Sequence, residues 1–360
     1  MSNDHIEPAW RIPVGQGRDL GIGIVGCGGI VQQGHLPAYR EAGLRVVAVH
    51  DRDSQRARAA AAEFGIPVVT ASARELVRAE DVDIVDVAVP PWAQPEIVAL
   101  AVSAGRHLLC QKPLALEMDQ ARTMVEAAES TGVLLAVNQQ MRWTAAMAAS
   151  RDLIKQGVIG RPTSAQLQVS GFADWTPWPW LAASPRLDVM YHSIHYLDSV
   201  RSIFGDPAWI TSIHGRVHEG SAVAGETMTT TVLEYDDGLE VLLTMNHADV
   251  HGATMNVFRF GGTDGALDGT IADEYDAVQG RGDTLTVRRA GSAPVPYEFD
   301  CRWLPDAFLG PMGDLMDAVA TGRAPQTSGR DNLRTLALVF GSYRSAQERR
   351  SIRVAELLDA

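Results

Sequence analysis

The chain has 360 residues, of which 46% are hydrophobic and 21% charged, and its formal net charge is −13. This composition predicts a soluble globular protein of about two domains. The negative charge disfavours nucleic acid and anionic membranes as partners, and no apolar run approaches the roughly 20 residues of a membrane helix. The N-terminus does not resemble a signal peptide, and the three cysteines lack disulfide or metal spacing. We therefore expect a cytoplasmic protein.

The chain begins with an arm, residues 1–18, rich in Pro, Gly and polar residues. We expect this arm to be exposed, and either ordered against a partner subunit or not ordered at all. Residues 20–51 then carry the clearest pattern in the sequence. An apolar run leads into a glycine cluster, a helix-compatible segment follows, and a second apolar run ends at an aspartate. This order predicts a βαβ unit that binds a dinucleotide.

The glycine cluster supplies the phosphate-binding part of this motif. Gly26 permits the tight turn after the first strand, and Gly28 lets the backbone approach a pyrophosphate closely. A helix that begins near Gly29 and Ile30 offers N–H groups and the positive end of its dipole to the phosphates. Val31 stands where the motif usually has a third glycine, which implies a wider approach of helix to strand. The alternative is a glycine-rich turn in an α/β protein that binds no cofactor.

The end of the second apolar run bears on the choice of cofactor. Asp51 can accept hydrogen bonds from the adenosine ribose 2′-OH, and its carboxylate repels a 2′-phosphate. The adjacent Arg52 can attract such a phosphate or stack on adenine. We therefore expect NAD as the cofactor, with NADP not excluded.

Strands and helices alternate from residue 54 to residue 138. Helices are predicted at 54–64, from 72 with a capping box, at 95–105 and at 118–131, and strands at 67–69, 83–89, 107–110 and 133–137. Such alternation predicts an α/β Rossmann domain with a doubly wound parallel sheet. We place this NAD(P)-binding domain at residues 19–142.

The pattern changes beyond residue 138. Short alternating strands are predicted at 163–170, 209–217, 228–235, 239–247, 255–260 and 284–289, with helices at 144–155, 187–204, 306–321 and 330–347. The sequence 236–238 predicts a hairpin turn. We therefore expect an α+β domain with a large, mostly antiparallel open sheet at residues 143–360.

Lys112 follows the fifth predicted strand, in the sequence Cys110-Gln111-Lys112-Pro113. Ligands bind at the carboxyl ends of strands in open parallel sheets, so an ammonium there can hydrogen-bond both a substrate hydroxyl and the nicotinamide ribose. The alternative is an ordinary surface lysine.

The glycine turn, Asp51, the sequence 89–91, Gln111-Lys112-Pro113 and His195-Tyr196-Leu197-Asp198 together resemble the glucose-fructose oxidoreductase / inositol dehydrogenase / MocA family over residues 19 to the end. The resemblance implies a Rossmann domain followed by a domain whose open sheet forms a homodimer or homotetramer interface. It implies hydride transfer between NAD(P) and a hydroxyl or ketone carbon of a sugar, cyclitol or glycoside. It also implies that Lys112 is the lysine of the family's Glu-Lys-Pro motif and that His195 is the acid–base histidine.

Three positions depart from the family pattern. Gln111 replaces a glutamate, Gln94 replaces a histidine, and Tyr191 stands where many members have an aspartate four residues before the histidine. On an α-helix Tyr191 and His195 share a face while His192 points roughly 100° away. We therefore assign Tyr191 a hydrogen-bonding role in catalysis, beside Lys112 and His195.

Further residues complete the predicted sites. Pro90, Trp92 and Gln94, in the loop after the fourth strand, are assigned with Gln111 to the cofactor. The substrate is assigned to Lys112, Arg142, Trp175, Trp178, His192 and His195. The tryptophans belong to a rigid loop at 172–185 that can stack on a sugar ring or instead plug the core or contact another subunit. Helical spacing permits a metal set of Asp188, His192, His195 and Asp198, but nicotinamide chemistry needs no metal and we predict none.

Chemically, alcohol oxidation needs a base for the hydroxyl proton, and histidine titrates near neutrality. A cationic lysine stabilises the developing alkoxide. Two other functions stay open: a glycoside hydrolase that oxidises its substrate transiently and regenerates NAD each turnover, and a non-catalytic cofactor-binding regulator or scaffold. Net NADH release distinguishes the dehydrogenase from the hydrolase.

Overall fold

The computed structural model describes residues 6–12, 15–175, 177–216, 223–252, 254–272, 282–301 and 303–358. The chain divides into two compact units. The Rossmann unit contains residues 12–143 and 304–333, and the C-terminal unit contains residues 1–11, 144–303 and 334–360, as far as they are described.

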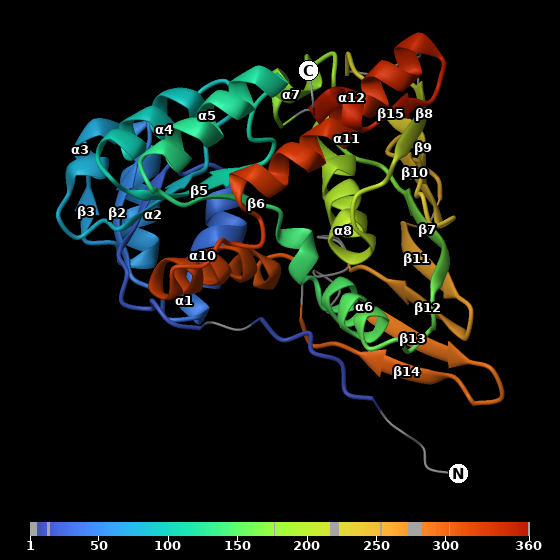
Figure 1. The fold of residues 1–360 in the computed structure, drawn as a ribbon. Coiled ribbons are helices and arrows are strands. Elements are labelled where there is room, and N and C mark those ends of the chain that lie inside the picture. Colours follow the sequence, from blue (N-terminus) through green and yellow to red (C-terminus); the bar gives the residue numbers. More distant parts are fainter. Residues whose placement is uncertain are drawn as a thin grey trace. The chain divides into compact units, whose positions relative to one another are not determined.

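The Rossmann unit is built on a six-stranded parallel sheet with the strand order β3-β2-β1-β4-β5-β6 (Figure 1). Its strands are β1 (Ile22–Val25), β2 (Val46–His50), β3 (Val68–Val69), β4 (Ile84–Val87), β5 (His107–Gln111) and β6 (Leu135–Asn138). The strands β1 and β4, which lie side by side at the centre, are buried along their whole length. The sheet order reverses between β1 and β4, so ligands are expected at the carboxyl ends of these strands. The predicted doubly wound parallel sheet is confirmed.

Helices cover both faces of this sheet (Figure 1). The core on one face combines strand residues with α1 (Leu36–Glu41), α2 (Ser54–Phe64) and α10 (Leu309–Thr321). On the other face lie α3 (Ala73–Arg78), α4 (Gln94–Ser103) and α5 (Met118–Ser130). Two short 3-10 turns, η2 (Gln140–Trp143) and η4 (Asp306–Phe308), also belong to this unit. Thus residues 304–333, which the sequence assigned to the second domain, pack with the Rossmann unit.

Local sequence signals explain several helix ends. Asp53 accepts hydrogen bonds from the N–H groups of Gln55 and Arg56 and caps α2, which ends at Gly65 with φ of 69°. Ser72 accepts from the N–H of Glu75 at 3.1 Å. The Glu75 carboxylate accepts in return from the N–H of Ala71 at 2.9 Å. These caps satisfy amide groups that the first helical turn leaves without partners.

The C-terminal unit is built on a nine-stranded sheet in the order β14-β13-β12-β11-β7-β10-β9-β8-β15. Its strands are β7 (Pro162–Ser170), β8 (Trp209–Gly215), β9 (Met228–Glu234), β10 (Glu240–Asn246), β11 (Met255–Gly262), β12 (Gly265–Thr270), β13 (Thr284–Arg289), β14 (Val295–Glu298) and β15 (Ile352–Arg353). Only β7 and β10 pair in parallel among the pairings described. Gly238, with φ of 85°, closes the β9–β10 hairpin as predicted. The predicted mostly antiparallel sheet is confirmed, and the predicted strand end at Val217 lies outside the described residues.

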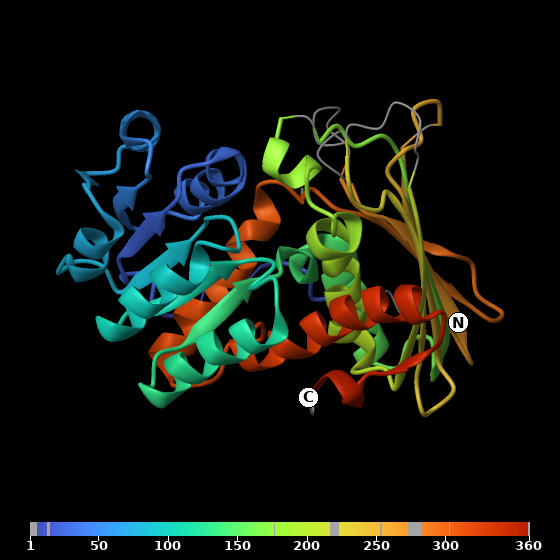
Figure 2. The same cartoon turned by 90° about the horizontal axis from the view of Figure 1, so that it is seen from above.

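Helices pack on one face of this sheet, and no helix of the described residues covers the opposite face (Figure 2). The helices of the unit are α6 (Ala145–Lys155), α7 (Pro179–Ala182), the π turn η3 (Val189–Ser193), α8 (Ile194–Phe204), most of α11 (Gly329–Glu348) and α12 (Ala355–Leu358). Ile213, on β8, is 71% exposed. The face of the sheet opposite the helices therefore presents at least one large apolar side chain.

The N-terminal arm is ordered against its own chain in its described part, contrary to the predicted alternatives. The Tyr297 hydroxyl donates to the carbonyl of Ile6 at 2.7 Å, and the N–H of Ala9 donates to Asp152 at 2.8 Å. The ring of Trp10 packs edge-on against Phe299. These contacts attach residues 6–11 to the C-terminal unit.

The strand β12 escaped prediction because glycine is a weak strand former. A Cβ atom on Gly269 would lie 2.4 Å from the Phe258 ring and 2.3 Å from the carbonyl of Thr284. The close packing of neighbouring strands therefore requires glycine there, and the sequence pattern loses its alternation.

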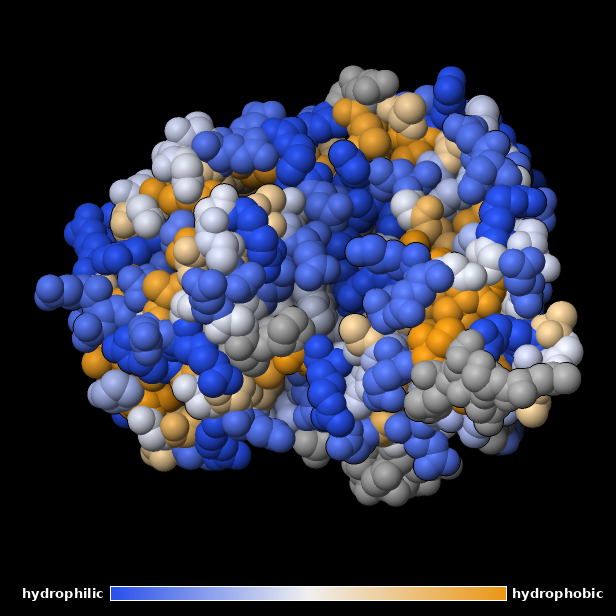
Figure 3. Space-filling view, turned by 60° about the horizontal axis from the view of Figure 1, so that its bottom comes forward, coloured by the Kyte–Doolittle hydropathy of each residue, from blue (hydrophilic) through white to orange (hydrophobic). Residues whose placement is uncertain are grey.

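The surface of the molecule is largely hydrophilic on the face drawn in Figure 3. Hydrophobic residues form scattered patches on the same face. Among the described helices, none combines the length and the apolar character that a membrane crossing demands. The cysteines Cys27, Cys110 and Cys301 are buried thiols that are not joined in disulfides.

Candidate functional site

The glycine loop after β1 has the geometry of a phosphate cradle. Gly26 adopts φ of 100°, and a Cβ atom there would lie 2.4 Å from the carbonyl of Ala88. A Cβ atom on Gly28 or Gly29 would meet nothing within 4 Å. Space is therefore open in front of the loop at the position where a pyrophosphate approaches backbone N–H groups. Ile30 follows the loop and is 39% exposed.

The helix after this loop begins with a π turn, η1 (Val31–His35), and continues as α1. Val31, the residue that departs from the glycine fingerprint, is fully buried in the core. A π turn is wider than an α turn, and it begins at the position where a larger side chain replaces glycine. The predicted helix is therefore present, with a different first turn.

Asp51 lies at the end of β2 and supports the glycine loop. One carboxylate oxygen accepts from the N–H of Cys27 and the other from the N–H of Asp53, each at 2.8 Å. Arg56 lies 3.8 Å from the carboxylate, whereas Arg52 is exposed. The carboxylate that the sequence assigned to the ribose is thus fixed in orientation beside the loop.

Lys112 follows β5 in a loop held by two glutamines. The amide nitrogen of Gln94 donates to the carbonyls of Gln111 and Pro113, both at 2.9 Å. The side-chain oxygen of Gln111 accepts from the N–H of Lys112 at 2.9 Å. Gln94 is fully buried, so it fixes the backbone on both sides of Lys112. Gln94 therefore positions the lysine loop, and the cofactor contact expected of it stays a prediction.

Gln111 also joins a buried group that the sequence analysis missed. Its amide nitrogen lies 3.2 Å from Nε2 of His35, whose Nδ1 lies 2.7 Å from the Asp86 carboxylate. Tyr39 donates to the same carboxylate oxygen at 2.7 Å, and Nδ2 of Asn138 lies 3.2 Å from Nε2 of His35. With the proton on Nδ1, His35 donates to Asp86 and accepts from the amides. We call Lys112, Gln94, Gln111, His35 and Asp86 the Lys112 network.

The contact between Gln111 and His35 explains why glutamine stands at position 111 in place of the family's glutamate. A glutamate at this position would direct a carboxylate lone pair toward the Nε2 lone pair of His35, whereas the glutamine amide donates to it. The lysine beside Gln111 is half-buried, and this burial lowers the pKa of Lys112 from 10.5 to about 8. An ammonium with such a pKa exchanges its proton close to neutral pH.

The other residues of the Rossmann unit that the sequence assigned to a site differ in their burial and contacts. Pro90 is half-buried, and Trp92 is 53% exposed in the loop before α4. Arg142 is buried, and its guanidinium donates to Asp331 at 2.6 Å and to the carbonyl of Gln326 at 3.0 Å. The guanidinium predicted to bind substrate is therefore engaged in joining η2 to the start of α11.

The histidine-rich segment of the C-terminal unit is not a continuous α-helix. The π turn η3 occupies Val189–Ser193, and the N–H of Ile194 bonds the carbonyl of Val189. Hydrogen bonds then run from i+5 to i, so the predicted sharing of one α-helical face by Tyr191 and His195 does not hold. The Tyr191 ring packs edge-on against Trp180, and the buried His195 ring packs edge-on against Trp303. Burial raises the pKa of Tyr191.

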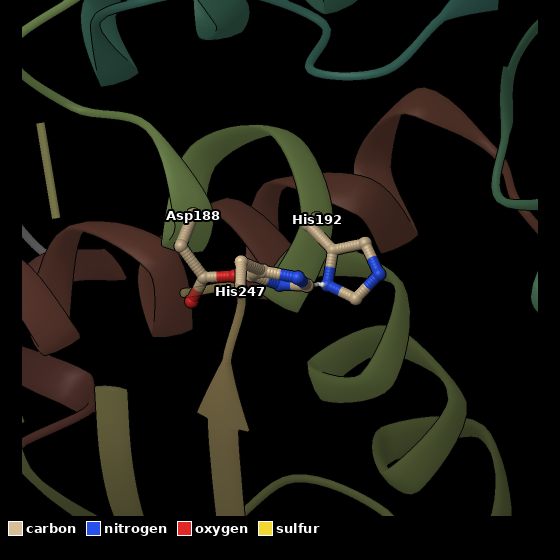
Figure 4. A group of neighbouring side chains, drawn as sticks. All are labelled: Asp188, His192 and His247. Atoms are coloured by element: carbon tan, nitrogen blue, oxygen red, sulfur yellow. Dashed lines mark hydrogen bonds and ion pairs between the residues drawn. The ribbon is translucent and has the colours of Figure 1, made fainter. Parts of the chain in front are cut away.

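His192 instead meets a histidine that sequence reasoning missed. Its Nδ1 lies 3.0 Å from Nε2 of His247, and Asp188 Oδ1 lies 2.8 Å from the same Nε2 (Figure 4). Burial alone would raise the pKa of Asp188, but hydrogen bonds and charge from the two histidines hold this pKa well below its ordinary range. We call Asp188, His192 and His247 the His247 cluster.

The tryptophan loop begins beside this cluster. The N–H of Ala173 donates to the carbonyl of His247 at 3.1 Å, and the Trp175 ring lies 5.9 Å from the His247 ring. Trp178 is 47% exposed. The structure therefore brings together two residues predicted to bind substrate, Trp175 and His192, through His247, which directly follows the strand β10 (Glu240–Asn246).

The metal set that helical spacing would permit is not formed as such. Asp198 accepts from the Thr335 hydroxyl at 2.6 Å and lies 3.9 Å from Arg201. Asp188 and His192 of that set do come together, with His247 as the third member.

The glycine loop and the ordered aspartate of the Rossmann unit fit a dinucleotide, which is typical of the class of nucleotide-dependent oxidoreductases. Comparisons with known proteins agree with this class. Residues 20–139 match "Oxidoreductase family, NAD-binding Rossmann fold", and residues 147–268 match "GFO/IDH/MocA C-terminal domain". The chain belongs to this Gfo/Idh/MocA oxidoreductase family. The resemblance inferred from the sequence is confirmed, as is a cofactor of the NAD type.

The named relatives include enzymes that convert sugars. The chain is 34% identical to a D-apiose dehydrogenase of Paraburkholderia graminis, over 93% of this chain and 89% of the relative. It is 28% identical to a 1,5-anhydro-D-fructose reductase of Ensifer adhaerens, over 90% and 95% of the two chains. An oxidoreductase from Agrobacterium radiobacter, solved with NAD+, L-tartaric acid and magnesium, superposes with a TM-score of 0.84 at 25% identity, covering 94% and 99%. These comparisons give no support to the glycoside hydrolase alternative.

Proposed function

We propose that this protein is an NAD-dependent dehydrogenase that oxidises a secondary hydroxyl of a sugar or cyclitol, or reduces the corresponding ketone. The observation that carries the proposal is Lys112. It follows a strand of a unit fitted for a dinucleotide, its backbone is fixed by Gln94 and Gln111, and its pKa is lowered to about 8.

Lys112 is proposed to donate a hydrogen bond to the reacting oxygen. A protonated lysine lowers the pKa of a hydroxyl and stabilises the negative charge that develops when the hydroxyl proton leaves. The bound nicotinamide supplies hydride chemistry at the substrate carbon. Because burial weakens the hold of Lys112 on its own proton, the same side chain can also return a proton when the ketone is reduced.

His195 is proposed as the residue that accepts the hydroxyl proton, by its match to the family histidine. Tyr191 is proposed as a hydrogen-bonding partner of the substrate. Because Tyr191 lies within the π turn η3, α-helical spacing from His195 does not assign it the place of the family's aspartate. Substitution of each residue by itself, His195→Gln and Tyr191→Phe, separates a proton-transfer role from a binding role. A proton acceptor lowers kcat, whereas a binding group raises KM.

The proposed substrate class is a small polyol. The names of the relatives, a D-apiose dehydrogenase and a 1,5-anhydro-D-fructose reductase, favour sugars. Aromatic faces suit sugar C–H groups, which supports the assignment of Trp175 and Trp178 to the substrate. For the cell, we propose a cytoplasmic enzyme that forms a homodimer or homotetramer through the uncovered face of the C-terminal sheet, where Ile213 is exposed.

The function is tested by NADH formation with a panel of pentoses, hexoses, anhydro sugars and inositols, and by NADH consumption with their ketones. Substrate-dependent NADH formation supports the proposal. Release of a free aglycone from aryl glycosides without net NADH would favour the hydrolase instead. Failure of every panel member, together with absence of NAD binding by calorimetry, would overturn the assignment.

The preference for NAD over NADP is tested at Asp51. Asp51→Ser removes the charge but keeps a hydroxyl acceptor near the N–H of Cys27. We expect the ratio of kcat/KM for NAD to that for NADP to fall about 10–100-fold, because this is the contribution to binding of a hydrogen bond to a charged group. Asp53→Asn, which retains an α2 cap, serves as the control and should leave the ratio unchanged.

A further inference from the structure

Three side-chain atoms of the His247 cluster converge on one point. Nε2 of His247 lies 2.8 Å from Asp188 Oδ1 and 3.0 Å from Nδ1 of His192, and the remaining pair, His192 Nδ1 and Asp188 Oδ1, is 3.6 Å apart. Ligand atoms around a four- to six-coordinate metal ion, with bonds of about 2.0–2.2 Å, are about 3.0–3.5 Å from one another. The cluster therefore already has nearly the spacing of a first coordination shell (Figure 4).

One proton cannot satisfy all three of these atoms. If Nε2 of His247 carries a proton, its 2.8 Å contact with Asp188 is an ordinary hydrogen bond, and Nδ1 of His192 competes for the same proton. If it carries none, its lone pair faces the carboxylate at 2.8 Å. A cation among the three atoms would accept all three lone pairs at once.

The surrounding contacts orient the carboxylate for such a role. Asp188 is fully buried, and its second oxygen, Oδ2, accepts from the hydroxyls of Ser193 at 2.6 Å and Thr229 at 2.8 Å. These bonds leave Oδ1 directed at the histidines. Outer partners that hold a ligand in this way are typical of metal sites.

The protein backbone also fixes the histidines. The N–H of His247 donates to the carbonyl of Thr227 at 2.9 Å, directly after β10. His192 lies in the π turn η3, and such turns are frequent at functional sites. The His192 side chain is 19% exposed while those of Asp188 and His247 are buried, so an ion can approach the cluster from the side of His192.

We propose that Asp188, His192 and His247 form a binding site for a divalent transition-metal ion of the Zn²⁺, Co²⁺ or Mn²⁺ class. Two imidazoles and one carboxylate suit these ions better than Mg²⁺ or Ca²⁺, which prefer oxygen ligands. This site requires neither NAD nor a sugar, so it stands apart from the dehydrogenase proposal.

The test uses the full-length, tag-free protein, stripped with a chelator and titrated with Co²⁺ and Zn²⁺ in the absence of NAD and substrate. We expect one ion per chain by calorimetry, and Co²⁺ bands in the visible spectrum that report nitrogen and oxygen ligands. His247→Gln and His192→Gln should abolish the bands and weaken binding by more than about 100-fold. Thr229→Val, which removes only an outer contact, should weaken binding about 10–100-fold.

His251→Gln is the matched control, because His251 is exposed and lies four residues beyond His247. Its ion binding should equal that of the wild type. Thermal unfolding of each metal-free variant establishes that it is folded, and added Zn²⁺ should raise the unfolding temperature of the wild type but not of His247→Gln. The proposal is overturned if the stripped wild-type protein binds no ion, or if the folded His247→Gln and His192→Gln variants bind it as tightly as the wild type.

Discussion

The Lys112 network and the His247 cluster each bury an aspartate against a histidine, but they arrange donors and acceptors in different ways. In the Lys112 network, His35 donates through Nδ1 to Asp86 and accepts through Nε2 from the amide nitrogens of Gln111 and Asn138. The donor Nδ1 thus faces an acceptor, and the acceptor Nε2 faces donors. In the His247 cluster, two ring nitrogens and a carboxylate oxygen face one another within 3.6 Å.

This difference separates a scaffold from a ligand site. A network in which donors and acceptors alternate holds its shape without any added group, and it suits the task of fixing the Lys112 loop. A set of converging acceptors is completed by a proton or a cation. Substitutions in the Lys112 network should therefore change stability or the proton chemistry of Lys112, whereas those in the His247 cluster should change ion binding.

Lys112→Met should produce the largest effect on activity. It removes the hydrogen-bond donor proposed for the reacting oxygen and keeps a side chain of similar length, so kcat should fall about 10²–10⁴-fold, with no comparable loss of stability. Steady-state kinetics and thermal unfolding measure the two effects. Ion binding at the His247 cluster should be unaffected. Retention of more than about a tenth of wild-type kcat would contradict the role of Lys112.

His35→Leu should produce the largest loss of stability. It removes a hydrogen-bonding partner from the buried Asp86 carboxylate and from the amides of Gln111 and Asn138. A buried charged group that loses a hydrogen-bonding partner costs about 3 kcal/mol, measured as the free energy of unfolding in urea. His247→Gln provides the contrast, because its main effect should fall on ion binding. A destabilisation by His35→Leu below about 1 kcal/mol would show that the network is not structural.

Gln94→Leu should have an intermediate effect. It leaves the buried carbonyls of Gln111 and Pro113 without their amide donor, which should cost about 2 kcal/mol of unfolding free energy. Because the lysine loop is then less well held, kcat should also fall, by about tenfold. The more conservative Gln94→His, which restores a donor and the residue usual in the family, should recover part of both. Unchanged kinetics in folded Gln94→Leu would remove Gln94 from the positioning role.

Gln111→Glu should have the smallest effect on kcat near neutral pH and should be visible in the pH profile, although a carboxylate that faces Nε2 of His35 should also lower the free energy of unfolding. Burial lowers the pKa of Lys112 to about 8, so the protonated donor is lost, and kcat/KM should fall, as pH rises through 8. A carboxylate beside the lysine favours its charged form, and the alkaline limb should move up by about one pH unit. Gln32→Glu, in the glycine-loop helix, is a control for an added charge in the same unit. An alkaline limb that stays in place would show that Lys112 is not the group titrating there.

The sign of the linked stability change follows from the same pKa. The native pKa of Lys112 lies below its unfolded value, so between about pH 8 and 10.5 the unfolded chain binds more protons. Stability contributed at this site therefore rises with pH across that window. The Lys112→Met variant should lack this contribution.

Much of the architecture follows from the sequence because it rests on local patterns. The βαβ unit, the α2 helix with its glycine end and the β9–β10 hairpin depend on periodicity, caps and turn residues, which neighbouring positions reveal. By contrast, β12 contains Gly265 and Gly269, whose place in the sheet depends on contacts with distant strands.

The candidate sites divide in the same way. Asp51 and Lys112 could be predicted because their positions follow the ends of predicted strands. His35 and His247 could not, since their partners Asp86 and His192 lie 51 and 55 residues away, and one sequence does not reveal which distant side chains meet. The π turn η3 further changed which residues of the histidine segment face each other. A histidine at the last position of the predicted strand 239–247 was the one local signal that could have indicated His247.

The measurement that tests the central claim most directly follows a deuterium label. A substrate from the sugar and cyclitol panel is prepared with deuterium on the carbon that bears the reacting hydroxyl, and the reduced cofactor is analysed by mass spectrometry. Direct hydride transfer predicts one deuterium in each NADH formed, and loss of this product in Lys112→Met. Unlabelled NADH, or turnover of the labelled substrate without reduced cofactor, would contradict the account.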